Sequence, residues 1–193
     1  NLVLINSDSC IIYRNLFAFG GLSGIFIKNS DNQIIHNNFV FQNGMLNPVF
    51  DGINIGFSNG SNVISNNIIK NNAANGIDLE QSIENNQIQF NTISSNGYLL
   101  SEKSGIRLFG ENNLIKKNII NANTGSGILV VSNSTNNVIT ENSIFNNGAF
   151  PDSFNNISHA IGIDLITPSE NQAIGLSPFY TLNDLNDFDI GAN

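Results

Sequence analysis

The chain has 193 residues, a formal net charge of -8 and a charged fraction of 11%, which suit one soluble unit rich in neutral side chains. Its 7 Lys and Arg residues are scattered along the sequence, so nucleic acid is excluded as an expected partner. No apolar run is long enough for membrane insertion, and the single cysteine, Cys10, excludes a disulfide framework and a thiolate metal cluster.

The first recurring element is Gly-Ile followed, one residue later, by another apolar residue. Apolar side chains alternate in it, as at Ile77 and Leu79, which predicts a short strand with one face inward. The copies begin at Gly24, Gly52, Gly76, Gly105, Gly127 and Gly162, and Asn1 opens a copy that lacks the glycine.

Two further elements follow along each copy, and both carry asparagine. The second is Asn-x-Ile, whose first position is filled by Asn62, Asn86, Asn113 and Asn137. The third begins with an unbroken column formed by Asn15, Asn38, Asn67, Asn91, Asn118 and Asn142. An apolar residue follows each of these by two places, so the unit is three short strands joined by three turns.

A unit of about 22 residues in its shortest copies cannot bury its apolar row alone and must stack on its neighbours. We therefore expect an all-β, right-handed parallel β-helix of about seven coils over residues 1–166. Asparagine has two expected uses at the turns. It tolerates positive φ, and identical amides one coil apart, about 4.8 Å, hydrogen-bond to each other as a ladder.

The repeat resembles those of the parallel β-helix families, which include pectate lyases, polygalacturonases, chondroitinase-type lyases, alginate epimerases and periplasmic NosD-like proteins. The ending, Gly162–Leu165 leading to residues 181–193, resembles the GIDL…NDxxDxDxGxN ending of large bacterial cell-surface β-helix proteins. The resemblance implies a pectin-lyase-like fold and a secreted or cell-surface location. In such proteins the chain normally continues, so we expect the acidic C-terminal segment, residues 167–193, to lead into a further coil or module.

Long insertions interrupt the repeat at one turn only, just before the first strand. They cover residues 44–51, 97–104 and 148–161, whereas the connection at residues 73–75 is short. Insertions at one turn project from one edge, so we expect them to wall a groove along the outer face of the first strands. The resemblance to pectate-lyase-like enzymes implies a substrate cleft in the same place.

Charged side chains gather on that outer face. Asp78 and Arg107 should lie one coil apart, close enough to touch. Asn54 should lie one coil before Asp78, on the side away from Arg107. Carboxyl pairs supply the acid and base of a glycosidase, and a lyase needs a base and a cation near its uronate. The candidate catalytic residues are Asp51, Asp78, Glu80 and Arg107. The alternative is a solvated strand face with a salt bridge between coils.

Other residues are candidates for contact with a sugar. Aromatic side chains in the long loops either stack on sugar rings or pin the loops to the coil beneath, and a loop histidine is a possible acid or base. The candidate substrate-binding residues are Asn54, Tyr98, Phe150, His159 and Asp164. His36 lies on a second strand, and we expect it to be an exposed surface residue away from the groove.

The acidic segment supplies candidate metal ligands. Asp184, Asp187 and Asp189 are spaced for a hard cation such as Ca²⁺ without matching the EF-hand loop, and a solvated acidic turn is the alternative. Soft metal ligands are scarce, since the chain contains only 1 methionine and 2 histidines. This scarcity argues against copper handling of the NosD type.

Two functions remain. The polygalacturonase signatures Asn-Thr-Asp, Asp-Asp and Gly-His-Gly are absent, as is the Asp-Pro-His-Glu run of alginate epimerases. We therefore favour a noncatalytic secreted or cell-surface module that contacts polysaccharide along the first-strand face. The alternative is a carbohydrate-active enzyme, a polysaccharide lyase or glycoside hydrolase, that uses the carboxylate row in the same groove. A mechanical stalk is a third, weaker interpretation.

Overall fold

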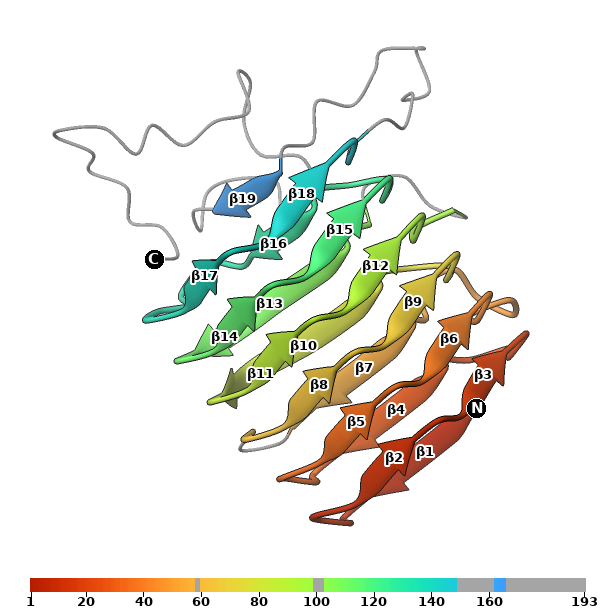
Figure 1. The fold of residues 1–193 in the computed structure, drawn as a ribbon. Helices are drawn as coiled ribbons and strands as arrows, with labels where there is room; N and C mark the ends of the chain where they lie inside the picture. The colour runs from red at the N-terminus through yellow and green to blue at the C-terminus, as the bar shows by residue number, and fades with distance from the viewer. Residues whose placement is uncertain (58–59, 99–102, 149–161, 166–193) are drawn as a thin grey trace, which may run out of the picture.

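The computed structural model of the chain describes residues 1–57, 60–98, 103–148 and 162–165. All the regular elements in these ranges are β-strands, and they form three parallel sheets that run along a solenoid (Figure 1). Within this part of the chain no helix is long and apolar enough to cross a membrane. The expected all-β parallel β-helix with three strands per coil is confirmed.

The three sheets take their strands in turn along the chain. The first sheet contains β1 (Leu2–Ile5), β4 (Ile25–Lys28), β7 (Ile53–Gly56), β10 (Ile77–Glu84), β13 (Ile106–Glu111), β16 (Ile128–Val130) and β19 (Ile163–Leu165). The second contains β2 (Ile11–Tyr13), β5 (Ile34–His36), β8 (Val63–Ser65), β11 (Gln87–Gln89), β14 (Leu114–Lys116) and β17 (Val138–Thr140). The third contains β3 (Leu16–Ala18), β6 (Phe39–Phe41), β9 (Ile68–Lys70), β12 (Thr92–Ser94), β15 (Ile119–Asn121) and β18 (Ser143–Phe145).

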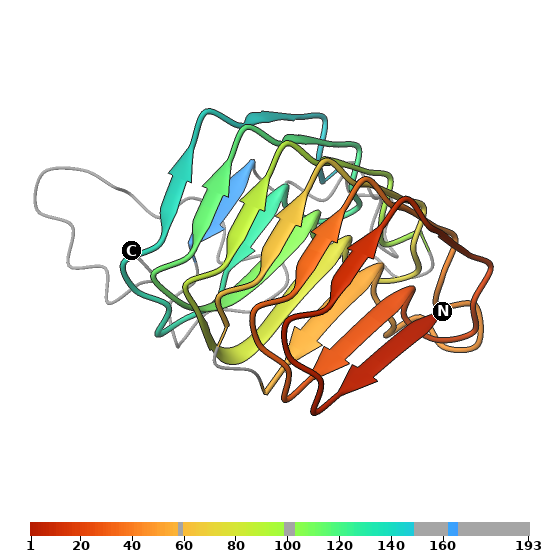
Figure 2. The same cartoon turned by 60° about the horizontal axis from the view of Figure 1, so that its bottom comes forward.

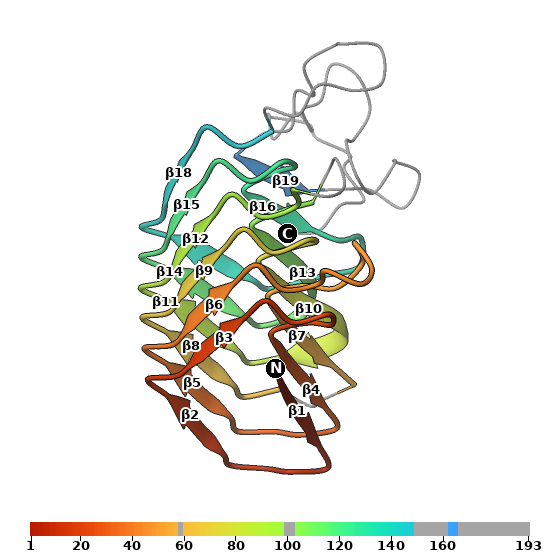
Figure 3. The same ribbon diagram turned by 90° about the vertical axis from the view of Figure 1, so that its right-hand side faces the viewer.

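Successive coils stack in register. Equivalent residues are partners across each ladder, as Ile77 is with Ile53 on one side and Ile106 on the other. Figure 2 shows the strands of each sheet as parallel rows, and Figure 3 shows the coils stacked from β1 to β18. Strands β1 to β18 make six complete coils, and β19 opens a seventh.

The inward side chains form one continuous apolar core. Ile77 and Leu79 of the first sheet are fully buried, as are Ile88 of the second sheet and Ile93 of the third. Because side chains alternate along a strand, each three-residue strand of the second and third sheets turns its central residue inward. Each buried aliphatic side chain stabilises the stack by about 1.5–3 kcal/mol relative to an exposed one.

Three asparagine ladders run along the turns. Asn91 donates from its backbone N and from Nδ2 to Oδ1 of Asn118, at 2.9 and 3.0 Å, and Nδ2 also donates to the carbonyl of Ile64 at 2.9 Å. The residues that donate a side-chain amide to the next coil in this way are Asn62, Asn86 and Asn113; Asn15, Asn38, Asn67, Asn91 and Asn118; and Asn43, Asn72, Asn96 and Asn123. The expected ladders are confirmed.

The left-handed residues of the turns are not the ladder residues. The residue just before each ladder asparagine has the positive φ, as with 59° at Phe90 before Asn91 and 55° at Lys117 before Asn118. Asparagine fills several of these positions, but Phe90, Lys117 and Ala122 fill others. The two uses expected of one asparagine are therefore divided between adjacent residues.

The glycine before the first strand is required by close packing. A Cβ on Gly76 would lie 2.6 Å from the carbonyl oxygen of Gly105 and 2.8 Å from Nδ2 of the ladder residue Asn96. Real Cβ atoms do not approach backbone oxygen this closely, so the missing side chain lets the ladder and the next coil meet. The Gly-Ile signature of the repeat thus reflects packing between coils.

The C-terminal predictions fall outside this description. Residues 166–193, which include the boundary of the acidic segment and the calcium candidates Asp184, Asp187 and Asp189, lie outside the described residues. The division into coils and an acidic segment, and the calcium site, therefore stay predictions.

Candidate functional site

The expected polar row lies on the outer face of the first sheet. Asn54 of β7, Asp78 of β10 and Arg107 of β13 are register partners, and Arg107 Nη1 donates to Oδ1 of Asp78 at 3.0 Å. The contact expected from the repeat spacing is therefore present. The salt bridge between coils that the alternative interpretation expected is also present, although Asn54 and Asp78 are only 6% and 8% exposed.

Burial and Arg107 act on Asp78 in opposite directions. Loss of water around the carboxyl raises the pKa of Asp78, whereas the charge and hydrogen bond of the Arg107 guanidinium lower it, and burial is the larger effect. Glu80 adds a smaller upward influence on the pKa and Lys103 a smaller downward one. Arg107 thus stabilises the charged form of a buried carboxyl group.

Asp51 is much more deeply placed than the loop edge where the sequence put it. It is 2% exposed, and its Oδ1 accepts from the backbone N and Nδ2 of Asn75 at 2.9 and 3.0 Å. Its Oδ2 accepts from Nδ2 of Asn54 at 3.0 Å. Burial first, and then the charge of Asp78, raise the pKa of Asp51 to about 8 despite these hydrogen bonds. Asp51 is therefore mostly protonated at neutral pH.

Asp51 belongs to a fourth polar column that the sequence analysis missed. The residue before the first-strand glycine is polar and buried in five successive coils, at Ser23, Asp51, Asn75, Ser104 and Ser126. Hydrogen bonds run along this column in the opposite sense to the ladders, because the backbone N of Ser104 donates back to Oδ1 of Asn75 at 2.8 Å. The signal was in the sequence, as a polar residue before each of the glycines from Gly24 to Gly127.

Glu80 lies over a space that a glycine leaves open. Gly56 has the equivalent position on the preceding coil, and a Cβ there would overlap Oε2 of Glu80. Oε1 of Glu80 accepts from Nδ2 of Asn54 at 3.0 Å, so one amide joins Glu80 to Asp51. Oδ1 of Asn54 is buried and has no hydrogen-bond partner among the described residues.

A pocket of about 330 Å³ lies on the outer face of the first sheet. Its lining residues are Phe57, Glu80, Arg107 and Phe109. Two of the four predicted catalytic residues, Glu80 and Arg107, therefore face it. Asp51 does not line it, and both of its oxygens are engaged by buried amides.

The two aromatic walls of the pocket were not identified from the sequence. Phe57 is 66% exposed, and Nζ of Lys28 lies 4.9 Å from its ring centroid. Phe109 follows Arg107 by two residues in β13, so it takes the next outward position of the same strand. Extending the alternation past the apolar pair would have found Phe109.

The polar row is interrupted toward the C-terminal end of the sheet. Leu129 of β16 stands between Arg107 and Asp164 in the register. It is 4% exposed and packs with Val131 and Phe109 in a small apolar cluster. Asp164, which is 7% exposed, is therefore separated from the pocket by an apolar patch.

The described long loop lies at the other end of the strands from the pocket. Residues 44–51 precede β7, whereas the pocket residues Phe57, Glu80 and Phe109 follow the inward apolar pair of their strands. Met45 and Leu46 donate from their backbone N to the carbonyls of Gly20 and Gly21 in the preceding coil, both at 3.1 Å. This loop follows the stack and does not line the pocket.

The other loop candidates are placed only in part. Tyr98 is 40% exposed and is not a lining residue of the pocket. Residues 99–102 and 149–161, which include Phe150 and His159, lie outside the described residues. The expected contribution of these two loops stays a prediction.

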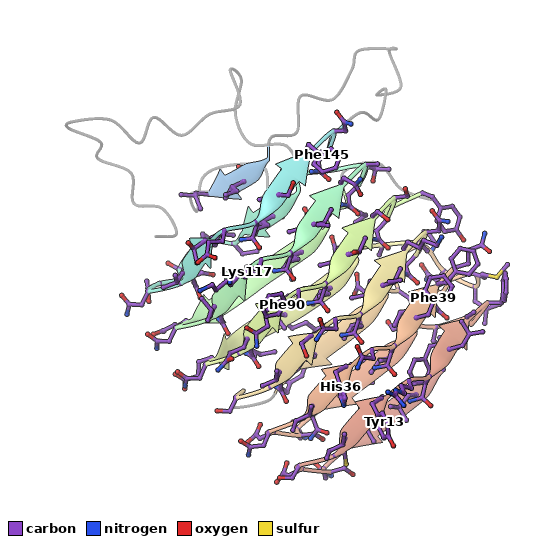
Figure 4. The ribbon with its side chains drawn as sticks, in the orientation of Figure 1. Tyr13, His36, Phe39, Phe90, Lys117 and Phe145 are labelled. Atoms are coloured by element: carbon purple, nitrogen blue, oxygen red, sulfur yellow. The ribbon has the colours of Figure 1, made fainter. Side chains whose placement is uncertain are left out.

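Aromatic and cationic contacts also lie on the outer face of the second sheet and at the turn that follows it (Figure 4). His36 is half-buried against Tyr13, with ring centroids 5.3 Å apart, and Nζ of Lys117 lies 5.6 Å from the ring centroid of Phe90. Each pair joins neighbouring coils. His36 is on a different sheet from the pocket, as expected, although it is less exposed than expected.

Two comparisons with known proteins bear on this chain. A family model described as "Periplasmic copper-binding protein (NosD)" matches residues 1–151. No protein with a curated description matches the chain. The family match covers all six complete coils and the whole of the polar row as far as Leu129.

Proposed function

The chain belongs to the NosD family of periplasmic β-helix proteins, and on that premise we propose that it is a noncatalytic module that contacts polysaccharide along the outer face of its first sheet. The family is one of periplasmic proteins, which work outside the cytoplasm. Secretion to the cell surface is the finer part of the proposal and rests on the resemblance of the C-terminal ending.

The observation that carries the proposal is the pocket between Phe57 and Phe109. Aromatic faces are suited to stacking on the apolar faces of sugar rings, and the polar atoms of Glu80 and Arg107 are suited to hydrogen bonds with hydroxyl groups. At about 330 Å³, the pocket is at the small end of the usual range for ligand sites, about 300–1,000 Å³. It suits one sugar unit of a longer chain.

The buried carboxyls favour binding over catalysis. A glycosidase needs two carboxyl groups on either side of the scissile bond, about 5–10 Å apart. Asp51 is hydrogen-bonded to Asn54 and Asn75, Asp78 is ion-paired with Arg107, and neither carboxyl lines the pocket. Glu80 is then the one carboxyl of the four candidates that lines the pocket. An enzyme would need a second acid from elsewhere.

Copper does not fit the residues that the structure describes. Cu(I) prefers thiolate, thioether and imidazole ligands. No group of three or more His, Cys, Asp or Glu side chains in the described ranges is placed to hold a metal ion. Cys10 lies just before β2, near the backbone carbonyls of Ser7 and Asp8. His36 of β5 stacks on Tyr13 of β2. We therefore assign no step to copper in this part of the chain.

A glycan array tests the proposal. Phe57→Ala, which removes an exposed ring without opening the core, should abolish or weaken binding at least about tenfold if the ring contributes as aromatic stacking on a sugar does. His36→Ala, on another sheet, should bind as the unmodified chain does. Absence of binding to any glycan by the intact, folded chain would contradict the proposal. Release of reducing or unsaturated sugar ends that disappears in Glu80→Gln would favour the enzyme instead.

A further inference from the structure

A second pocket lies beside the first and shares one wall with it. It has a volume of about 300 Å³, and Phe109 lines both. Its lining residues are Glu84, Phe109, Gly110, Glu111 and Asn133. The two pockets therefore follow the outer face of the first sheet as adjacent subsites.

The two longest strands of the first sheet build this second pocket. β10 has 8 residues and β13 has 6, whereas the other strands of the sheet have 3 or 4. The pairing of β10 with β13 shifts between Leu79 and Ile83 and then resumes, with Glu84 opposite Glu111. The irregularity thus sets two glutamates side by side, about 4.8 Å apart at their Cα atoms.

This pair of glutamates has no cation of its own in the described structure. Like charges directly opposite each other on neighbouring strands are destabilising. The ion pairs of the described residues are those of Arg107 with Asp78 and of two lysines with Glu141, so neither Glu84 nor Glu111 takes part in one. The nearby cations lie at the first pocket, where Arg107 is paired and Lys28 lies over the ring of Phe57.

We propose that the second pocket binds a protonated amino group, and that the polysaccharide of the proposed function carries amino sugars. This inference rests on the proposed function and names its substrate class. An ammonium between Glu84 and Glu111 makes charge-assisted hydrogen bonds to both, and the ring of Phe109 gives it a cation–π contact. The exposed amide of Asn133 supplies a donor and an acceptor for a hydroxyl group.

The same charges discriminate against other ligands. A uronate carboxylate would meet Glu84 and Glu111 in the second pocket, so an acidic sugar unit is repelled at that subsite. A hard divalent cation takes six or more oxygen ligands, and the described residues offer no group of three acidic side chains placed around one ion.

The test compares three short oligosaccharides: glucosamine, N-acetylglucosamine and galacturonate oligomers of the same length. Binding is measured by calorimetry at about pH 6, above the ordinary pKa of Glu and below that of an amino group. The intact chain should bind the glucosamine oligomer at least about tenfold more tightly than the galacturonate oligomer. Glu84→Gln and Glu111→Gln should each weaken glucosamine binding roughly tenfold and leave N-acetylglucosamine binding unchanged.

Two control variants separate this inference from the proposed function. Glu141→Gln, which alters an exposed glutamate that pairs with Lys116 and Lys117 on the second sheet, should leave all three affinities unchanged. Phe57→Ala should weaken binding of the glucosamine and N-acetylglucosamine oligomers together. Binding of the glucosamine oligomer that is no tighter than that of the galacturonate oligomer, or that is insensitive to Glu84→Gln and Glu111→Gln, would overturn the amino-sugar inference alone. Failure of all three oligomers and of a wider glycan array would overturn both proposals.

Discussion

The turns and the outer face of the first sheet use polar residues in contrasting ways. At the turns, one residue type repeats in every coil, and each buried amide finds the same partners one coil away, as Asn91 does with Asn118. On the first-sheet face no two neighbouring coils carry the same residue, since Asn54, Asp78, Arg107 and Leu129 follow one another. Repetition builds the scaffold, and departure from repetition builds the site.

The difference also appears in how well the buried groups are satisfied. Each inner ladder asparagine has its amide paired on both sides. In the site, Oδ1 of Asn54 lacks a partner and the pKa of Asp51 is raised to about 8 by burial and by Asp78. Oδ1 of Asn121 on the third sheet is also unpaired among the described residues, so the raised pKa of Asp51 is the feature that distinguishes the candidate site, because perturbed pKa values are concentrated at functional sites.

The largest expected effect is a loss of stability when an asparagine of the regular ladders is replaced. In Asn91→Leu, the backbone N and Nδ2 of Asn67 lose Oδ1 of Asn91 as an acceptor, and Oδ1 of Asn118 loses one of its two donors inside buried turns. Each unpaired buried group costs about 1–3 kcal/mol, so denaturant unfolding should show a loss of at least that size. The same substitution at Asn118 should behave alike. Unchanged unfolding midpoints for both variants would contradict the structural role of the ladder.

A smaller effect should come from the irregular region, and it should depend on pH. Burial raises the pKa of Asp51 from its ordinary value of 3.8 to about 8, so between these pH values the folded chain holds a proton that the unfolded chain has released. Its contribution to stability is full below about 4 and is lost as pH rises through about 8. Asp51→Asn keeps an acceptor for Asn75 but cannot ionise.

The variant Asp51→Asn should therefore flatten the fall in Tm between about pH 5 and pH 8, and at the upper end it should be more stable by roughly 1 kcal/mol or more. Thermal unfolding across this range measures it. The matched control is Asp8→Asn at an exposed aspartate, which should retain the slope of the unmodified chain. Equal slopes for the unmodified chain and Asp51→Asn would mean that Asp51 is not protonated in the folded state.

The smallest expected effect tests whether the positive-φ residue and the ladder asparagine of one turn have separate roles. Ala122 has a φ of 54° and is exposed, and it precedes the ladder residue Asn123. Ala122→Asn places a residue that tolerates the left-handed region there and should stabilise the chain by about 0.5 kcal/mol. Asn123→Ala, one residue later, should destabilise it. A stabilising effect of both changes would contradict the separation of φ and ladder roles.

The fold could be predicted from the sequence because the same pattern of apolar and polar residues recurs in every coil. The alternation at Ile77 and Leu79 predicted the inward face, and the spacing of Asp78 and Arg107 predicted their contact. The division of turn roles was not accessible, because Asn37 and Asn38 or Asn66 and Asn67 occur as pairs and the sequence alone does not say which one turns left.

The site was accessible only in part. The polar row was predicted, as was a groove along the outer face of the first strands with the insertions as its walls. The insertion that is described in full, residues 44–51, does not line the pocket, and some pocket residues come from where β10 and β13 extend beyond the repeat and carry Phe109 and Glu111. Residues outside a repeat follow no column, so their partners in space cannot be read from the spacing.

The most direct test of the central claim is a map of where a sugar binds. Backbone amide resonances would be followed by NMR during titration with the best oligosaccharide found on the array. We predict that the shifted resonances cluster at Phe57, Glu80, Arg107 and Phe109, with His36 and Phe90 unchanged. A cluster on the second or third sheet, around Tyr13, His36 and Phe90, would contradict the claim that the first-sheet face is the binding surface.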